Sequence, residues 1–141
     1  MTDKPSRITL SRARGFRRPE GTIQVDRATV FGNPWQVGDP GVWWMPDSAG
    51  GNRWETTFHF GFPIDQGAAV DFFATWIHSG NLPLMPDNLT QRGRAVLRES
   101  MALRRNLILS RLPALRGHPL GCRCKPGTPC HADVLLEIAN A

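Results

Sequence analysis

The sequence lacks any apolar run that approaches the roughly 20 residues needed to span a membrane. Its first segment, MTDKPSRITLSRARG, has no apolar core of the kind that secretory signals contain. Cysteine is scarce and odd in number, with three residues in the chain, which argues against a scaffold held by disulfide bonds. We therefore expect a cytoplasmic protein without a membrane partner.

The common sequence motifs that identify a catalysed reaction or a bound cofactor are absent as well. The chain has no Gly-x-Gly-x-x-Gly fingerprint, no P-loop and no pair of catalytic carboxylates. Its 141 residues, 40% hydrophobic and 21% charged, contain no internal repeat and are typical of a single globular domain over residues 1–141. These features predict one fold and leave the substrate, the reaction and the oligomeric state open.

Lysine is scarce: only two of the 17 basic residues are lysines, and the other 15 are arginines. The bases gather in residues 4–18 and in residues 92–125, where Glu99 is the only acid. Arginine suits phosphate because its planar guanidinium donates two parallel hydrogen bonds. Two interpretations follow: a phosphate-containing partner, either a small molecule or a nucleic acid, or a solvated face that reflects the codon usage of a GC-rich genome.

The apolar pattern predicts short strands and longer helices. Strands are expected over residues 8–10, 22–25 and 54–60, and helices over residues 68–79, ending at Gly80, and from Asn88 or Thr90 to a break at Leu112–Pro113. Residues 38–53 are rich in Gly, Pro, Asp and Ser and are predicted to form a long surface loop. Within that loop Trp43 and Trp44 are candidates for base stacking.

The chain ends in a predicted strand, loop and helix. Residues 119–124 are short and alternate in polarity, and Thr128 and Pro129 are suited to the N-cap and first position of a helix. Early strands, central helices and this last unit predict an α/β domain with a mixed sheet flanked by helices. The C-terminal strand-loop-helix is expected to be Rossmann-like, with parallel pairing favoured over a purely antiparallel sheet.

All three cysteines lie in this final unit. With Thr128 as the N-cap, Cys130 and His131 fall in the first helical turn, where free backbone N–H groups and the helix dipole favour a thiolate or a bound anion. Arg123 and Lys125 add positive potential. This predicts an anion-binding pocket in which Cys130 has the lowest thiol pKa and is a nucleophile or a polar wall, and His131 is an acid or base.

A metal site is the alternative interpretation, since Cys122, Cys124, Cys130 and His131 are four donors of the zinc type within ten residues. Against zinc, a helix that starts at residue 128 turns the side chains of 130 and 131 about 100° apart. The chain also has no second Cys-x2–4-Cys pair. No cofactor is therefore the first expectation, with zinc as the alternative, and a third interpretation has the cysteines as small core residues.

A second candidate constellation is Arg27 with the turn Gly32-Asn33-Pro34. Gly32 allows close backbone approach, and Asn33 can donate and accept hydrogen bonds to a base or ribose; the alternative is an ordinary turn. If both motifs build one site, we expect their loops to meet at the same edge of the sheet, as ligand-binding loops of open α/β sheets do.

Together, RATVFGNPW and LGCRCKPGTPCHADVLLEIAN resemble an uncharacterised family catalogued as domain of unknown function 4326, which is common in bacteriophage and bacterial genomes. The residues that match its signature are Arg27, Gly32, Asn33, Pro34, Cys122, Cys124, Cys130 and His131. Arg123 departs from it, since relatives often have an aromatic residue there. The resemblance implies no reaction; a bacteriophage origin would place the protein in the host cytoplasm.

Two functions follow as hypotheses. The first is a nucleotide- or nucleoside-handling protein of nucleic-acid modification or nucleotide metabolism, with Arg27, Gly32, Asn33, Arg123 and Lys125 binding the ligand. The second is a zinc-stabilised module that binds nucleic acid without catalysis. Metal content separates the two, because a structural zinc contributes directly to folding.

Overall fold

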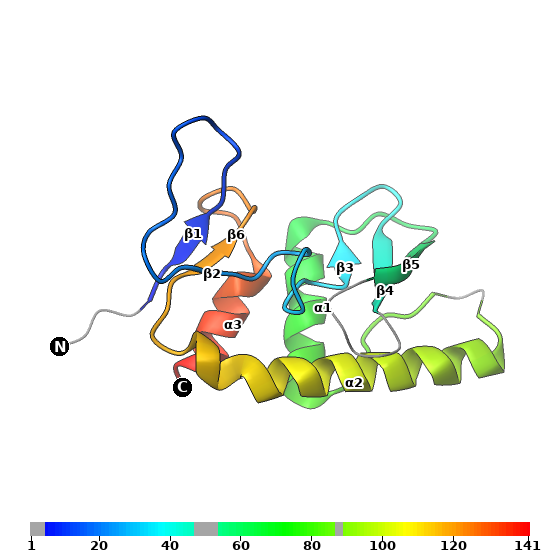
Figure 1. Ribbon diagram of the computed structural model, residues 1–141. Coiled ribbons are helices and arrows are strands. Elements are labelled where there is room, and N and C mark those ends of the chain that lie inside the picture. The colour runs from blue at the N-terminus through cyan, green and yellow to red at the C-terminus, as the bar shows by residue number, and fades with distance from the viewer. Residues whose placement is uncertain (1–4, 47–53, 87–88) are drawn as a thin grey trace.

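The computed structural model describes residues 5–46, 54–86 and 89–141. In chain order its elements are β1 (Arg7–Thr9), β2 (Ile23–Gln24), β3 (Trp35–Gln36), β4 (Val42–Pro46), β5 (Trp54–His59), α1 (Gln66–Ser79), α2 (Gln91–Leu115), β6 (Leu120–Cys122) and α3 (His131–Ala139) (Figure 1). None of the helices in these ranges combines the length and the apolarity that a crossing of the bilayer requires.

The predicted α/β class is confirmed, with the strands divided between two sheets. β6 lies between β1 and β2 and pairs in parallel with both, while β3, β4 and β5 form an antiparallel sheet. Parallel and antiparallel pairings thus occupy separate three-stranded sheets instead of one mixed sheet. The connection from β2 to β6 carries the antiparallel sheet, α1 and α2, since a parallel pair needs a long crossover. The likeness of β6 and α3 to a Rossmann unit stays a prediction.

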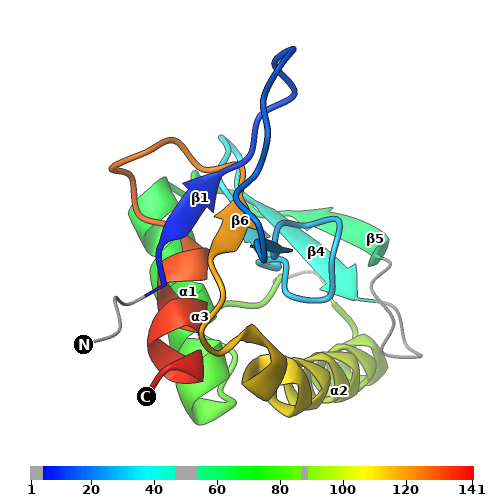
Figure 2. The same ribbon diagram turned by 60° about the vertical axis from the view of Figure 1, so that its left-hand side comes forward.

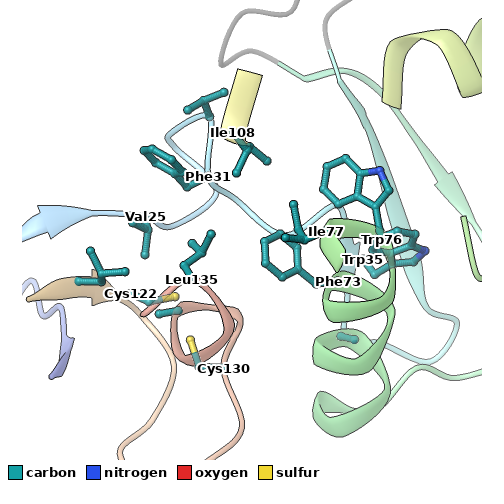
Figure 3. Packing of buried hydrophobic residues seen from close by; sticks show 14 of the residues in the cluster. Val25, Phe31, Trp35, Phe73, Trp76, Ile77, Ile108, Cys122, Cys130 and Leu135 are labelled. Carbon is teal, nitrogen blue, oxygen red and sulfur yellow. The ribbon is translucent and has the colours of Figure 1, made fainter. Parts of the chain in front are cut away.

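The helices close the core around both sheets. α3 packs against β6, β1, α1 and α2, while α1 also contacts β3 and α2 also contacts β4. Figure 3 shows Trp35, Phe73 and Trp76 packed at one end of the buried cluster, with Cys122 and Cys130 at the other. The aromatic rings meet edge to face, and the ring centroids of Trp35 and Trp76 are 5.9 Å apart.

Both long helices start at side-chain caps. Asp65 accepts a hydrogen bond from the Ala68 backbone N–H (2.7 Å) at α1, and Thr90 accepts one from Gly93 (3.0 Å) at α2. Gly80 ends α1 with φ near 79°, as its position in the sequence predicts. The predicted break of α2 at Leu112–Pro113 is wrong, because α2 continues to Leu115. Leu112 and Leu115 are both buried, and this burial offsets the backbone hydrogen bond that Pro113 cannot donate.

The predicted surface loop over residues 38–53 is also corrected. Its first part contains β4, which pairs with β3 and β5, and residues 47–53 lie outside the described part of the chain. Trp43 is fully buried, with its ring centroid 5.3 Å from that of Trp35, so it cannot stack on a base. The Trp44 indole N–H donates to Gln36 Oε1 at 2.6 Å, which holds that ring against β3.

The cap of α1 gives a direct test of this fold. Asp65→Ala leaves the first N–H groups of α1 without their side-chain acceptor and should lower the free energy of unfolding by about 1 kcal/mol. Asp71→Ala makes the same charge change at an exposed position of α1 that forms no cap, and should alter stability by less than about 0.5 kcal/mol. Urea unfolding followed by tryptophan fluorescence measures both; equal effects would contradict the capping assignment.

Candidate functional site

The two sequence motifs meet at the carboxyl edge of the parallel sheet. Because β1, β2 and β6 run in the same direction, the loops that follow them leave the sheet at one edge. Between these loops lies a pocket of about 510 Å³. Of the candidate site residues, Arg27, Asn33, Cys122, Arg123, Cys124 and His131 line it; Gly32, Lys125 and Cys130 do not.

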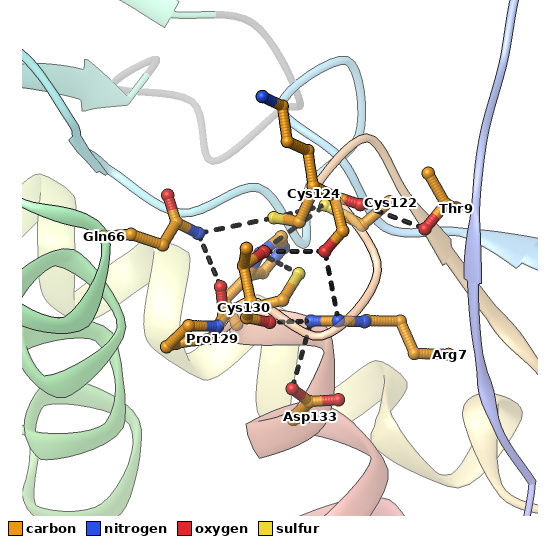
Figure 4. Close-up of polar contacts among 11 residues, drawn as sticks. Arg7, Thr9, Gln66, Cys122, Cys124, Pro129, Cys130 and Asp133 are labelled. Carbon is orange, nitrogen blue, oxygen red and sulfur yellow. Dashed lines mark hydrogen bonds and ion pairs between the residues drawn. The ribbon is translucent and has the colours of Figure 1, made fainter.

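The three thiols form a compact cluster (Figure 4), and those of Cys122 and Cys124 line the pocket. The Sγ atoms of Cys122, Cys124 and Cys130 all lie within 4.8 Å of one another, with 3.7 Å between Cys122 and Cys124. His131 joins them, because its Nδ1 is 3.9 Å from Cys122 Sγ and 3.8 Å from Cys130 Sγ. Three sulfur donors are therefore gathered from a strand, a loop and a helix start, and one nitrogen donor lies beside two of them.

This arrangement depends on where α3 begins. The prediction that Thr128 caps the helix is wrong: Cys130 is the N-cap residue, in extended conformation, and His131 is the first helical residue. The Thr128 hydroxyl donates back to the Lys125 carbonyl at 2.6 Å, and Gly127 has a φ of 78°, so residues 125–128 form a turn of their own. Because Cys130 is not a helical residue, its side chain and that of His131 are not held to the separation of about 100° between successive helical positions.

The His131 ring is fixed on both sides. Its Nε2 lies 2.7 Å from the Val25 carbonyl oxygen, and because a carbonyl only accepts, Nε2 carries the proton. Nδ1 is consequently the nitrogen that faces the sulfur atoms. The ring is buried and stands edge-on to Phe73, with centroids 5.2 Å apart. The Val25 carbonyl and the Phe73 ring therefore fix the orientation of the imidazole without any bound ligand.

The thiol pKa values run opposite to the expected order. Hydrogen bonds from Cys124 and then Cys130 lower the pKa of Cys122. The hydrogen bonds with Cys122 raise the pKa of Cys124 and, together with burial, the pKa of Cys130. The prediction that Cys130 has the lowest thiol pKa is wrong. Cys130 is fully buried, which leaves a nucleophile at this position without access to the pocket.

The first turn of α3 also holds a carboxylate of its own. Asp133 forms an ion pair with Arg7 at 3.1 Å, and the same guanidinium donates to the Thr128 carbonyl at 2.7 Å (Figure 4). This pairing ties β1 to the loop before α3. The Asp133 carboxylate lies in the first turn of α3 and interacts favourably with the helix dipole. It therefore occupies the role that the sequence analysis predicted for a bound anion.

Arginine side chains surround the mouth of the pocket. Arg123 pairs with the buried Asp26 through Nε and Oδ2 at 3.3 Å, and the Arg27 guanidinium lies over the Trp44 ring, 5.4 Å from its centroid. Burial lowers the pKa of Arg27, whereas Cys122, Asp26 and Cys124 act to raise it; the guanidinium stays charged at any ordinary pH. Arg27 therefore brings a positive charge to the pocket lining, where it interacts electrostatically with Cys122 and Cys124.

Asn33 and Gly32 make their closest contacts within the protein itself. Asn33 Nδ2 donates to the Ala69 carbonyl at 2.9 Å, and its Oδ1 accepts from the Trp35 N–H at 3.0 Å, which ties the loop to α1. One amide hydrogen and one lone pair remain for a ligand. A Cβ at position 32 would lie 2.6 Å from the Arg27 Cα, so the close approach that requires Gly32 is made by the chain itself.

Sequence reasoning missed several polar residues that line the pocket. They are Arg12, Gln24, Asp26, Gln36 and Gln66. Gln66 contacts the cysteine loop directly, since its Nε2 donates to the Pro129 carbonyl at 2.6 Å and lies 3.5 Å from Cys124 Sγ (Figure 4). Asp26 is the second residue after β2 and could have been found by extending the carboxyl-edge rule to that strand. No motif marks the others.

Fold and site together define an α/β domain with a cysteine–histidine centre beside an arginine-lined pocket. A family model matches residues 8–141, and the chain belongs to that family, the domain of unknown function DUF4326. Searches of the curated proteins and of the solved structures give no significant match.

Asn33 provides a test of the site's framework. Asn33→Ala removes two buried hydrogen bonds and leaves the Trp35 N–H without its acceptor, so the free energy of unfolding should fall by about 2–3 kcal/mol in the absence of any ligand. Asn106→Ala, at an exposed position of α2, should change it by less than about 0.5 kcal/mol. Chemical denaturation measures both; unchanged stability of Asn33→Ala would show that Asn33 does not hold the loop.

Proposed function

We propose that the protein is a zinc-stabilised module whose pocket binds a phosphate-containing nucleotide, either free or within a nucleic acid. Three distances between neighbouring donor atoms carry the proposal. With Zn–S near 2.3 Å and Zn–N near 2.0 Å, a tetrahedral site sets sulfur atoms about 3.8 Å apart and sulfur and nitrogen about 3.6 Å apart. The observed 3.7 Å between Cys122 and Cys124, and 3.8–3.9 Å from His131 Nδ1 to Cys130 and Cys122, match these values.

The surroundings of His131 support the same assignment. A zinc-ligating histidine usually donates its second ring N–H to a carbonyl or carboxylate, which fixes the tautomer and raises the basicity of the ligating nitrogen. The Val25 carbonyl receives such a bond from Nε2. The positive charge of Arg27 near Cys122 and Cys124 favours the thiolate form that a metal requires.

Other uses of the thiols fit less well. A disulfide requires sulfur atoms about 2 Å apart, and Cys122 and Cys124 are separated by nearly twice that distance. A role as apolar filler gives no reason for the His131 nitrogen to face two sulfur atoms. Nucleophilic catalysis needs access, which burial denies to Cys130. We assign the thiols of Cys122 and Cys124, which do line the pocket, to metal ligation, so the centre stabilises the fold and takes part in no catalytic step.

The pocket supplies the groups that would recognise a nucleotide. Arg12, Arg27 and Arg123 line it together with Asp26, whose carboxylate is paired with Arg123, so positive charge is in excess. Guanidinium groups bind phosphate oxygens in pairs. Gln24, Gln36 and Gln66 add amide groups that can reach the edge of a base. A volume of about 510 Å³ is within the range of small-molecule sites.

Metal analysis tests the first part of the proposal. Protein purified without chelator should contain about one zinc per chain, and a strong chelator should lower its melting temperature or unfold it. Cys122→Ser should lose the metal, whereas Thr128→Ala, in the loop between β6 and α3, should retain it. Mass spectrometry of the metal content and thermal unfolding provide the readouts. Metal-free protein whose melting temperature is indifferent to chelator would contradict the zinc centre.

Calorimetric titration with nucleoside phosphates tests the second part. The zinc-loaded protein should bind a nucleoside diphosphate, and Arg123→Gln should weaken binding about tenfold or more, because a charge-assisted hydrogen bond contributes about 1.5–3 kcal/mol. Arg116→Gln is a matched control at an exposed position outside the pocket. The phosphate-free nucleoside should bind more weakly than the diphosphate. Equal affinity for the two compounds would contradict phosphate recognition.

A further inference from the structure

We infer that the loop from residue 10 to residue 22, between β1 and β2, is an arm that binds the backbone of a single-stranded nucleic acid and leads it toward the pocket. The inference rests on the proposed function in one respect, namely that the pocket accepts a nucleotide. Figures 1 and 2 show this loop projecting from the carboxyl edge of the parallel sheet, away from the rest of the molecule.

The charges of the arm are strongly one-sided. It carries the exposed arginines Arg12, Arg14, Arg17 and Arg18, with Glu20 as its only acid. Within the part of the chain that the structure describes, no hydrogen bond or ion pair engages these four guanidinium groups. Arginines with structural roles elsewhere differ: Arg7 is held by Asp133, and Arg105 donates to the Trp76 and Ile77 carbonyls. The arm therefore exposes four positively charged guanidinium groups to solvent.

The backbone of the arm presents an aromatic ring among these charges. The Phe16 N–H donates to the Ala13 carbonyl at 3.1 Å, and Gly15, at φ 86°, closes this turn. A second turn is closed by the Thr22 N–H on the Pro19 carbonyl at 3.2 Å. Phe16 is 39% exposed, although a side chain of this size is ordinarily buried. Arg17 and Arg18 follow it directly in the sequence.

A cationic track with an aromatic ring is the combination by which proteins hold single strands, because phosphates pair with the cations while a base stacks on the ring. Arg12 belongs both to the arm and to the pocket lining, and Arg27 and Arg123 continue the positive charge inward. This continuity favours a nucleic acid over an anionic membrane, for which a pocket beside the loop would have no use. A strand is favoured over a duplex because a pocket of about 510 Å³ has room for one unstacked nucleotide.

The test separates the arm from the pocket and from net charge. The triple variant Arg14→Gln, Arg17→Gln, Arg18→Gln changes the arm without touching a pocket residue. The matched control, Arg92→Gln, Arg98→Gln, Arg111→Gln, removes the same charge from exposed positions of α2. Binding of fluorescein-labelled oligothymidylate of about 20 nucleotides is followed by anisotropy at several salt concentrations. Each variant is also titrated with the nucleoside diphosphate and with vesicles of phosphatidylserine and phosphatidylcholine.

The arm variant should bind the oligonucleotide at least tenfold more weakly than the control variant, with a smaller salt dependence, because each phosphate contact contributes a slope of about 0.7 for single strands. Phe16→Ala should weaken binding about tenfold with an unchanged slope, since stacking is uncharged. Both variants should still bind the nucleoside diphosphate. Failure of the unsubstituted protein to bind it would contradict the proposed nucleotide pocket and would leave the nucleic-acid-binding role of the arm to the oligonucleotide titrations. Equal weakening by the control variant, or loss of vesicle binding with oligonucleotide binding intact, would overturn the arm.

Discussion

The hydrogen bond from His131 Nε2 to the Val25 carbonyl is the contact on which the site depends. It joins the end of β2 to the start of α3, two segments that lie more than a hundred residues apart in the chain. It also decides which ring nitrogen faces the thiols. Without it, the ring could turn and the donor set would lose its nitrogen. A buried polar contact of this kind specifies one arrangement because its alternatives leave the carbonyl unpaired.

The sheet topology explains why this contact can form. β6 enters between β1 and β2, so the last part of the chain completes a sheet that the first part begins. The carboxyl ends of the three strands then bring Arg12, Arg27 and Arg123 to one edge around the thiols. The metal centre we propose would hold the loop after β6 against β2, and the same loop positions the pocket. Stability and ligand binding thus share one piece of structure.

The sequence predicted the local elements more fully than the long-range ones. Gly80 and Thr90 mark helix ends by their own backbone and side-chain chemistry, and the two motif loops were expected at a common edge because parallel strands impose it. The start of α3 was missed because a threonine hydroxyl can donate as well as accept, and Thr128 donates to Lys125 instead of capping. β4 and the end of α2 depend on burial against distant residues. The thiol pKa order depends on sulfur contacts that no spacing reveals.

X-ray absorption at the zinc K-edge of the purified protein tests the central claim most directly, because it measures the ligands and not only the presence of metal. The account predicts three sulfur atoms near 2.3 Å from zinc, contributed by the clustered Cys122, Cys124 and Cys130. It also predicts one imidazole nitrogen near 2.0 Å, contributed by His131, whose Nδ1 faces two of the sulfur atoms. In His131→Ala the imidazole contribution to the spectrum should disappear, while the shell of three sulfur atoms remains. A first shell of oxygen and nitrogen alone, or of four sulfur atoms in a chain with three cysteines, would contradict it.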